Sequence, residues 1–159
     1  MAITTAYSAS VTITRPANTT AYTANDVLGG AIKFNTIGPP GGRIMVTSAS
    51  IEGDVGAIPA GMTSIMKLAC YSVTPPSEIA DNGVFDLPAG DRASFLGFIT
   101  IGSLADLGST LYVEADQINK QLQLAAGCSD LYAYLVTAGG FTPAGNSEVY
   151  KVTLHSVAL

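Results

Sequence analysis

Apolar and polar residues alternate along most of the chain, and Gly, Pro, Asn or Asp interrupts this alternation at short intervals. Alternation with a period of two places successive side chains on opposite faces, which indicates β-strands. No long segment repeats its apolar residues at the helical spacing of about 3.6 residues. The pattern therefore predicts an all-β protein.

Several segments share this strand pattern, and their residue ranges are 10–14, 27–35, 43–52, 62–74, 93–101, 110–115, 120–126, 131–138 and 149–156. Many short strands joined by turns are typical of a sandwich or barrel. The unequal connections favour a jelly roll or Greek key over a meander. We predict an antiparallel β-sandwich of about nine strands.

Three segments carry more specific predictions. The strand at 62–74 is apolar on both faces, so we expect it to be buried on both sides. Residues 75–92 form a long excursion with several turn signals, and Ser77 could cap a short helical turn at 77–81. Residues 1–9 are predicted to form an N-terminal arm of a single domain spanning 1–159.

Charged residues make up only 12% of the chain, whereas 48% of its residues are hydrophobic. The charged share is about half of that in an average globular domain. A surface with so little charge suggests that part of it is covered by other protein.

The net charge of −5 argues against a nucleic acid partner. The seven basic residues are scattered, whereas phosphate binding needs clustered Lys and Arg. A membrane partner is not expected either, because no apolar stretch approaches the roughly 20 residues that span a bilayer. The first residues lack the pattern of a signal peptide, so synthesis in the cytoplasm is expected.

The residues that could carry chemistry are few. His155 is the single histidine, and we expect it to be a strand side chain at a sheet edge. Cys70 and Cys128 are expected to be buried free thiols, because nothing indicates an oxidising compartment. One histidine and two separated cysteines match neither a zinc motif nor a nucleophile with its base.

Two pairs of carboxylates lie two residues apart, Glu52 with Asp54 and Glu114 with Asp116. In a strand this spacing points both side chains to one face, which could serve calcium binding or glycosidic cleavage. Both pairs are expected at strand ends beside turns, where Asp hydrogen-bonds to the local backbone. We therefore favour a structural role, and expect neither an enzyme nor a cofactor.

Four stretches resemble, in order, the capsid decoration or cement proteins of tailed bacteriophages. They are TRPANTTAYTANDVLG (14–29), SEIADNGVFDLPAGDRASFLGFITI (77–101), LYVEADQINKQLQL (111–124) and LYAYLVTAGGFTPAGNSEVYKVTL (131–154). The resemblance implies a β-sandwich on the outside of an icosahedral capsid, often a homotrimer. Its partner would be the major capsid protein, and its role would be to stabilise the shell.

A virion role predicts partner contacts in weakly charged loops and in the N-terminal arm. The candidate contact residues are Ile3, Tyr7, Arg15, Ile37, Pro39, Pro40, Arg43, Ile79, Phe85 and Phe141. Independently of the resemblance, Arg15 is expected at an exposed strand end, where it could pair with an acid. Tyr22 is expected to pack its ring under a loop and to bond through its hydroxyl to backbone.

Other functions remain open at this point. A head-fibre or tail component would suit the same fold. A carbohydrate-binding sandwich needs exposed aromatic rings, and the chain has no Trp but seven Tyr. A cupin-like metal enzyme is the weakest alternative, because it would need several histidines.

Overall fold

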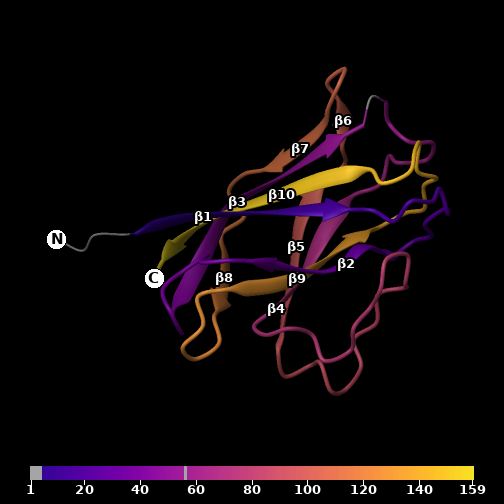
Figure 1. The fold of residues 1–159 in the computed structure, drawn as a ribbon. Helices are drawn as coiled ribbons and strands as arrows, with labels where there is room; N and C mark the ends of the chain where they lie inside the picture. Colours follow the sequence, from indigo (N-terminus) through magenta and orange to yellow (C-terminus); the bar gives the residue numbers. More distant parts are fainter. Residues whose placement is uncertain (1–4, 56) are drawn as a thin grey trace.

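The computed structural model describes residues 5–55 and 57–159, which form two antiparallel sheets packed face to face (Figure 1). The strands are β1 (Ala6–Thr14), β2 (Val27–Phe34), β3 (Arg43–Asp54), β4 (Met66–Tyr71), β5 (Phe95–Gly102), β6 (Ala105–Asp106), β7 (Leu111–Ala115), β8 (Lys120–Gln123), β9 (Leu131–Thr137) and β10 (Val149–Ala158). The predicted all-β sandwich is confirmed, with ten strands. Within the described ranges no helix is present that is long and apolar enough to cross a membrane.

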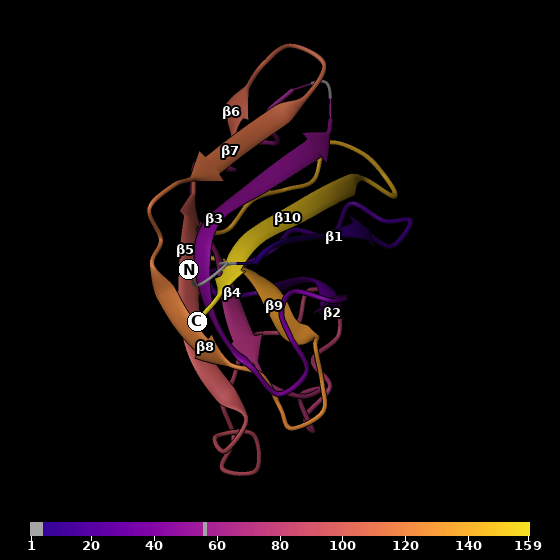
Figure 2. The ribbon, with the colours of Figure 1, turned by 90° about the vertical axis from the view of Figure 1, so that its left-hand side faces the viewer.

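The six-stranded sheet has the order β1-β10-β3-β7-β6, and β8 pairs with the first part of β3 (Figure 2). The four-stranded sheet has the order β2-β9-β4-β5. Without the short β6 and β8, every connection crosses from one sheet to the other except the one between β4 and β5. This strand order is that of a jelly roll, in which two Greek keys form two facing sheets.

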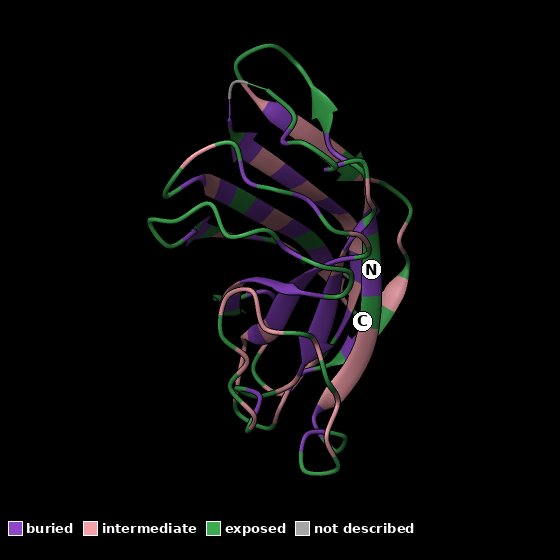
Figure 3. Cartoon of the chain, turned by 90° about the vertical axis from the view of Figure 1, so that its right-hand side faces the viewer, coloured by how far each residue is buried: buried purple, intermediate pink, exposed green. Residues whose placement is uncertain are grey.

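The two sheets differ in how they bury their faces. Along β10 the buried and the more exposed residues alternate, because one face packs on the core and the other faces solvent. By contrast, β4 and β9 are buried almost throughout, as the continuous purple strands in Figure 3 show. The prediction that the strand within 62–74 is buried on both sides is therefore confirmed.

The excursion between β4 and β5 covers the outer face of the four-stranded sheet. The buried residues of that face are Val27, Ala69, Tyr71, Tyr134 and Val136. Ile79, Phe85 and Leu87 of the excursion pack against them. An apolar sheet face is thus covered by the protein's own chain.

The helical turn predicted at 77–81 is wrong, because Ser77 lies in a bend whose backbone bonds to the side chains of Asp91 and Tyr134. The amide of Ser77 donates to both carboxylate oxygens of Asp91, at 3.2 and 3.3 Å. The carbonyl of Ser77 accepts a 2.7 Å hydrogen bond from the Tyr134 hydroxyl. Ser77 therefore connects the start of the excursion to its end and to β9, and does not cap a helix.

Part of the segment predicted as an N-terminal arm lies in the first strand. β1 begins at Ala6 and pairs with β10 along its whole length, so residues 6–9 belong to the sheet. Residues 1–4, which include Ile3, lie outside the described residues.

A glycine in β2 allows the two sheets to approach each other. Gly29 has a φ of +78°, and the register of β2 with β9 shifts beside it, which marks a β-bulge. A Cβ atom on Gly29 would collide with the side chain of Ile13 on β1. Close packing here therefore depends on the absence of a side chain.

Gly29→Ala is expected to lower the free energy of unfolding by about 2–4 kcal/mol, from backbone strain at positive φ together with overpacking. Urea denaturation measures the loss. Gly90→Ala is the matched control, because a Cβ there meets no atom within 4 Å. It should change stability by no more than about 0.5 kcal/mol. Equal losses in the two variants would contradict this account of the bulge.

Candidate functional site

The outer face of the six-stranded sheet carries rows of small polar side chains from neighbouring strands. The strand register places Ser10 of β1 beside Thr153 of β10, then Ser50 of β3 and Glu114 of β7. The hydroxyls of Ser10 and Thr153 lie 2.8 Å apart and share a hydrogen bond. This face, which we call the hydroxyl face, is polar and open to solvent.

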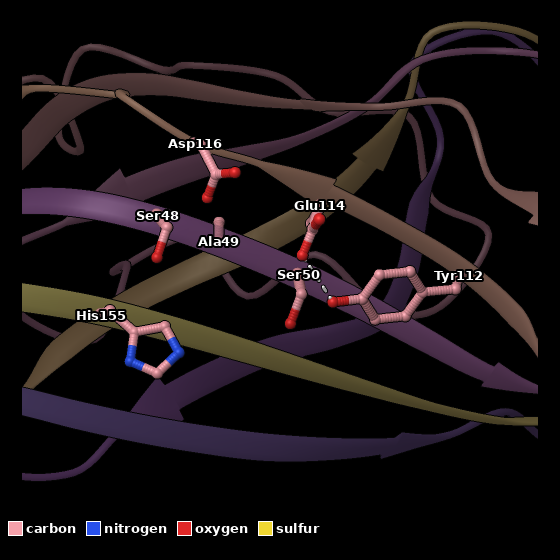
Figure 4. A pocket seen from close by; sticks show the side chains of 7 residues that line it. All are labelled: Ser48, Ala49, Ser50, Tyr112, Glu114, Asp116 and His155. Atoms are coloured by element: carbon pink, nitrogen blue, oxygen red, sulfur yellow. Dashed lines mark hydrogen bonds between the residues drawn. The ribbon is translucent and has the colours of Figure 1, made fainter.

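A shallow hollow of about 70 Å³ lies on the hydroxyl face (Figure 4). Its lining residues come from β3, β7, β10 and the residue after β7, and are Ser48, Ala49, Ser50, Tyr112, Glu114, Asp116 and His155. A typical small-molecule pocket has about 300–1,000 Å³. The hollow could therefore hold a small group or one edge of a larger ligand.

The acids of the hollow shape its hydrogen bonding. The Tyr112 hydroxyl donates to Glu114 Oε2 at 2.9 Å, and this bond raises the pKa of Tyr112. Asp116 lies on the same side of β3 as Glu114, and His155 lies on the opposite side of β3, on β10, as Figure 4 shows. The hollow thus offers carboxylate and hydroxyl groups together with one imidazole.

Covalent catalysis needs a nucleophile in contact with a base. Among the hydrogen bonds of residues 5–55 and 57–159, none joins His155 to Ser48 or to a carboxylate. Within the same ranges, no three His, Cys, Asp or Glu side chains are grouped to hold a metal ion. His155 is exposed, but its predicted place at a sheet edge is wrong, since β10 lies between β1 and β3.

The two carboxylate pairs lie at strand ends, as expected. Glu52 and Glu114 lie inside β3 and β7, whereas Asp54 ends β3 and Asp116 follows β7. Glu52 forms an ion pair with Lys151 across the sheet, with 3.3 Å between carboxylate and ammonium. The two glutamates therefore point to the hydroxyl face, and the expected placement of both pairs at strand ends is confirmed.

Arg15 is buried, with 2% of its surface exposed, so the predicted exposed position is wrong. Its Nη1 atom lies 3.7 Å from Glu148 Oε2, and this pair is buried on both sides. Its Nε atom donates a 2.6 Å hydrogen bond to the Tyr22 hydroxyl. A buried charge needs such partners, and the expectation that Arg15 pairs with an acid is confirmed.

Tyr22 bonds through its hydroxyl to side chains, so the predicted bond to backbone is wrong. The hydroxyl donates to Asp81 Oδ1 at 2.6 Å, and it accepts from Arg15. Burial and the bond to Asp81 raise the pKa of Tyr22. Its ring stacks on Phe141, with 4.7 Å between the ring centroids. Tyr22 therefore anchors the β1–β2 connection to two other segments.

The contacts of Arg15, Tyr22, Asp81 and Glu148 form one buried network, which we call the arginine network. Asp81 also accepts a 2.7 Å hydrogen bond from the Gly29 amide. Both carboxylate oxygens of Glu148 accept hydrogen bonds, Oε1 from a loop amide and Oε2 from the Tyr150 hydroxyl. The network therefore joins the excursion, β2 and the loop before β10. Sequence analysis missed both acids, since no local pattern relates them to Arg15.

The predicted contact residues divide by burial. Pro40 and Arg43 are exposed, and the half-buried ones are Tyr7, Pro39, Ile79 and Phe85. By contrast, Arg15, Ile37 and Phe141 are at most 3% exposed. Their side chains pack inside the fold and are not available to a partner.

Both cysteines are free, as predicted, but only Cys70 is buried and Cys128 is half-buried. Burial raises the pKa of the Cys70 thiol to about 12. The Cys70 thiol is therefore protonated at neutral pH.

No protein-family model and no curated protein matches this sequence. Among solved structures, the capsid of Ralstonia phage GP4 is similar at 15% identity and a TM-score of 0.41, over 98% of this chain and 84% of that chain. The decameric BFDV capsid protein is similar at 10% identity and a TM-score of 0.40, over 99% of both chains. PliG, a periplasmic lysozyme inhibitor of Aeromonas hydrophila, has 15% identity and a TM-score of 0.32, over 96% and 87%. The fold resembles that of viral capsid proteins at low identity, and no family is assigned.

Proposed function

We propose that this protein is a non-enzymatic structural component of a virion that binds the outer surface of a tailed-phage capsid and stabilises the shell. The observation that carries the proposal is the jelly-roll strand order, with β1-β10-β3-β7 facing β2-β9-β4-β5. Jelly rolls serve as viral capsid domains, as lectins and as cupins. With its single histidine the chain is a poor candidate for the cupin class.

The sequence stretches that resemble decoration proteins support the proposal further. Three of them meet in the arginine network: Arg15 and Tyr22 lie in 14–29, Asp81 in 77–101 and Glu148 in 131–154. Residues far apart in the sequence thus have a common structural reason to occur together.

Exposed apolar and aromatic side chains beside the excursion support a binding surface for the shell. Val84 and Phe98 are 62% and 38% exposed, and Phe98 contacts Phe85 of the excursion edge-on at 5.5 Å. The Lys67 ammonium lies 4.7 Å from the centre of the Phe98 ring. Apolar and aromatic side chains are typical of the centres of protein interfaces. We call the surface formed by Val84, Phe85, Phe98 and Lys67 the excursion face. We propose that it contacts the major capsid protein.

Purified protein mixed with undecorated capsids should co-sediment in a saturable, stoichiometric manner, and the capsids should gain heat resistance. Phe98→Asp is expected to weaken binding by about tenfold or more, because a charge would be desolvated at the interface. Thr153→Asp, on the hydroxyl face, is the matched control and should bind like the wild type. Failure of the wild type to bind capsids would contradict the proposal, and binding to tails alone would favour a tail or fibre component.

Carbohydrate binding is a second candidate function, favoured by the hollow on the hydroxyl face. Its carboxylates and hydroxyls could bond to sugar hydroxyls, and the half-buried Tyr112 ring could pack on a sugar. A glycan screen tests this function with Tyr112→Ala as the comparison. Wild-type binding that is lost in this variant would establish a glycan site. A screen in which the wild type binds no glycan would leave the virion role as the remaining candidate.

A further inference from the structure

β1 forms one edge of the six-stranded sheet and pairs only with β10 among the strands described. The bonds from Arg15 N to Glu148 O (2.9 Å) and from Ala158 N to Thr5 O (3.0 Å) show which alternate residues of β1 direct their backbone groups toward β10. Odd-numbered residues of β1 therefore bond to β10, and even-numbered residues point their N–H and C=O groups to the free edge. These edge residues are Ala6, Ser8, Ser10, Thr12 and Thr14. Within the described part of the chain, no hydrogen bond uses their backbone groups.

The other sheet edges carry protection that β1 lacks. At the edge of β2, Asp81 accepts from the Gly29 amide, and Val27 bonds at 2.8 Å to both Asn82 and Gly83 of the excursion. β5 is irregular, with two register shifts against β4, and β6 has two residues. Proteins commonly protect edges by such covers, bulges and short strands, or by charges and prolines. The nine residues of β1 include no charge, proline or glycine.

We propose that β1 is an interaction edge that pairs antiparallel with β1 of a second copy of this chain, around a two-fold axis at Ser10. The six-stranded sheets of the two copies then form one continuous sheet. This inference goes beyond the proposed function, and it holds whether or not the protein binds a capsid.

The backbone of β1 is complementary to itself in this register. With Ser10 opposite Ser10, Ser8 faces Thr12 and Ala6 faces Thr14, so all five edge residues on each strand find a partner. Each such pair exchanges two hydrogen bonds, which gives about ten bonds in all. A shift of the register by one residue would oppose groups that point away from each other. A shift by two residues would leave one of the five edge residues of each strand without a partner among the five, so the register with Ser10 opposite Ser10 forms the most bonds.

The side chains of β1 also suit a second copy. On the solvent face only small uncharged side chains oppose each other, so no like charges meet. On the core face, Tyr7 would lie opposite Ile13 of the second copy and Ala9 opposite Val11. Tyr7 and Val11 are half-buried apolar side chains at the open end of the core. A two-fold pair would cover both of them, as expected of an isologous interface.

Sedimentation equilibrium of the whole protein, from micromolar to near-millimolar concentration, tests the pairing. The wild type is expected to show a monomer–dimer equilibrium. In Ser10→Lys the two ammonium-bearing residues would face each other across the axis, with Cα atoms about 5.5 Å apart. Their repulsion should raise the dimer dissociation constant by about tenfold or more.

Thr153→Lys is the matched control. It removes the same hydroxyl pair with Ser10 and adds the same charge, but on the neighbouring strand β10. In the dimer its two copies would be three strand spacings apart, about 14 Å, which exceeds the screening length of about 8–10 Å. The dissociation constant of this variant should stay near the wild-type value, and both variants should keep the wild-type circular dichroism spectrum.

Amide hydrogen exchange gives an independent readout on the wild type. The amides of Ser8, Ser10 and Thr12 should become protected as concentration rises, whereas those of Ala9 and Val11 should be protected at every concentration. A wild type that stays monomeric, a dimer equally stable in both lysine variants, or a trimer whose Ser8 and Ser10 amides exchange freely would each overturn the proposal.

Discussion

Arg15→Ala is expected to lower the free energy of unfolding by about 3–5 kcal/mol, because it leaves a buried carboxylate without its counter-charge. Glu148 Oε2 lies 3.7 Å from Arg15 Nη1, and both side chains are almost fully buried. The Tyr22 hydroxyl also loses the 2.6 Å hydrogen bond from Arg15. Urea denaturation at neutral pH measures the effect.

Lys151→Ala is the control for Arg15→Ala. It also removes a cation from an ion pair, but the side chains of Lys151 and Glu52 are 50% and 45% exposed. Solvent screens such a pair, so the loss should not exceed about 1 kcal/mol. A loss in Arg15→Ala as small as that in Lys151→Ala would show that the arginine network does not hold the fold.

Arg15→Met combined with Glu148→Met provides a second check. Replacing both partners with apolar groups removes the unpaired charge, so the double variant should lose less stability than Arg15→Ala. Part of the loss should remain, because Glu148 also accepts hydrogen bonds from Gly145 and Tyr150. If the double variant lost more unfolding free energy than Arg15→Met and Glu148→Met lose when added together, an unpaired buried charge would not be the cause of the losses.

Alkaline unfolding is expected to be steep, with most of the stability lost as pH rises from about 10 to about 12. Burial is the main cause that raises the pKa of Tyr22, Tyr71 and Tyr150 above the ordinary value of 10.0. For Tyr71 the pKa is raised to about 12. A raised folded-state pKa gives stability that is complete below pH 10 and is lost as pH rises toward the folded-state value.

The three tyrosines together should give a slope approaching about 4 kcal/mol per pH unit near pH 11. Circular dichroism and the part of the phenolate absorbance that comes from the buried tyrosines, followed against pH, should change together in one step. The buried phenols would then ionise only as the chain unfolds. A gradual phenolate titration of all the tyrosines in a chain that stays folded would contradict this account.

Tyr71→Phe isolates one of these groups. The Tyr71 hydroxyl is buried and has no hydrogen-bond partner in the described residues, so its removal should cost little at neutral pH. The alkaline transition of this variant should be shallower and shifted to higher pH. An unchanged transition would show that Tyr71 does not contribute to alkaline unfolding.

The sequence alone identified the fold class and most strands within a few residues, because alternation with a period of two is a local property. It also identified a strand buried on both faces, now β4, and the absence of a disulfide between Cys70 and Cys128. For the candidate site, it singled out His155, Glu114 and Asp116, but not the serines and Tyr112 beside them. The spacing of residues along one strand fixes the face on which each side chain lies. It does not determine which residues of a neighbouring strand lie beside that side chain.

The tertiary structure decided which strands are neighbours, which edges stay open and which charges are buried. The jelly-roll order leaves β1 at an edge and places β10 between β1 and β3, so His155 lies within the sheet. Arg15 precedes a proline and was expected in solvent, yet it meets Glu148 inside the fold. Such partners are far apart in the sequence, and only the packing of two sheets removes them from water and makes their pairing necessary.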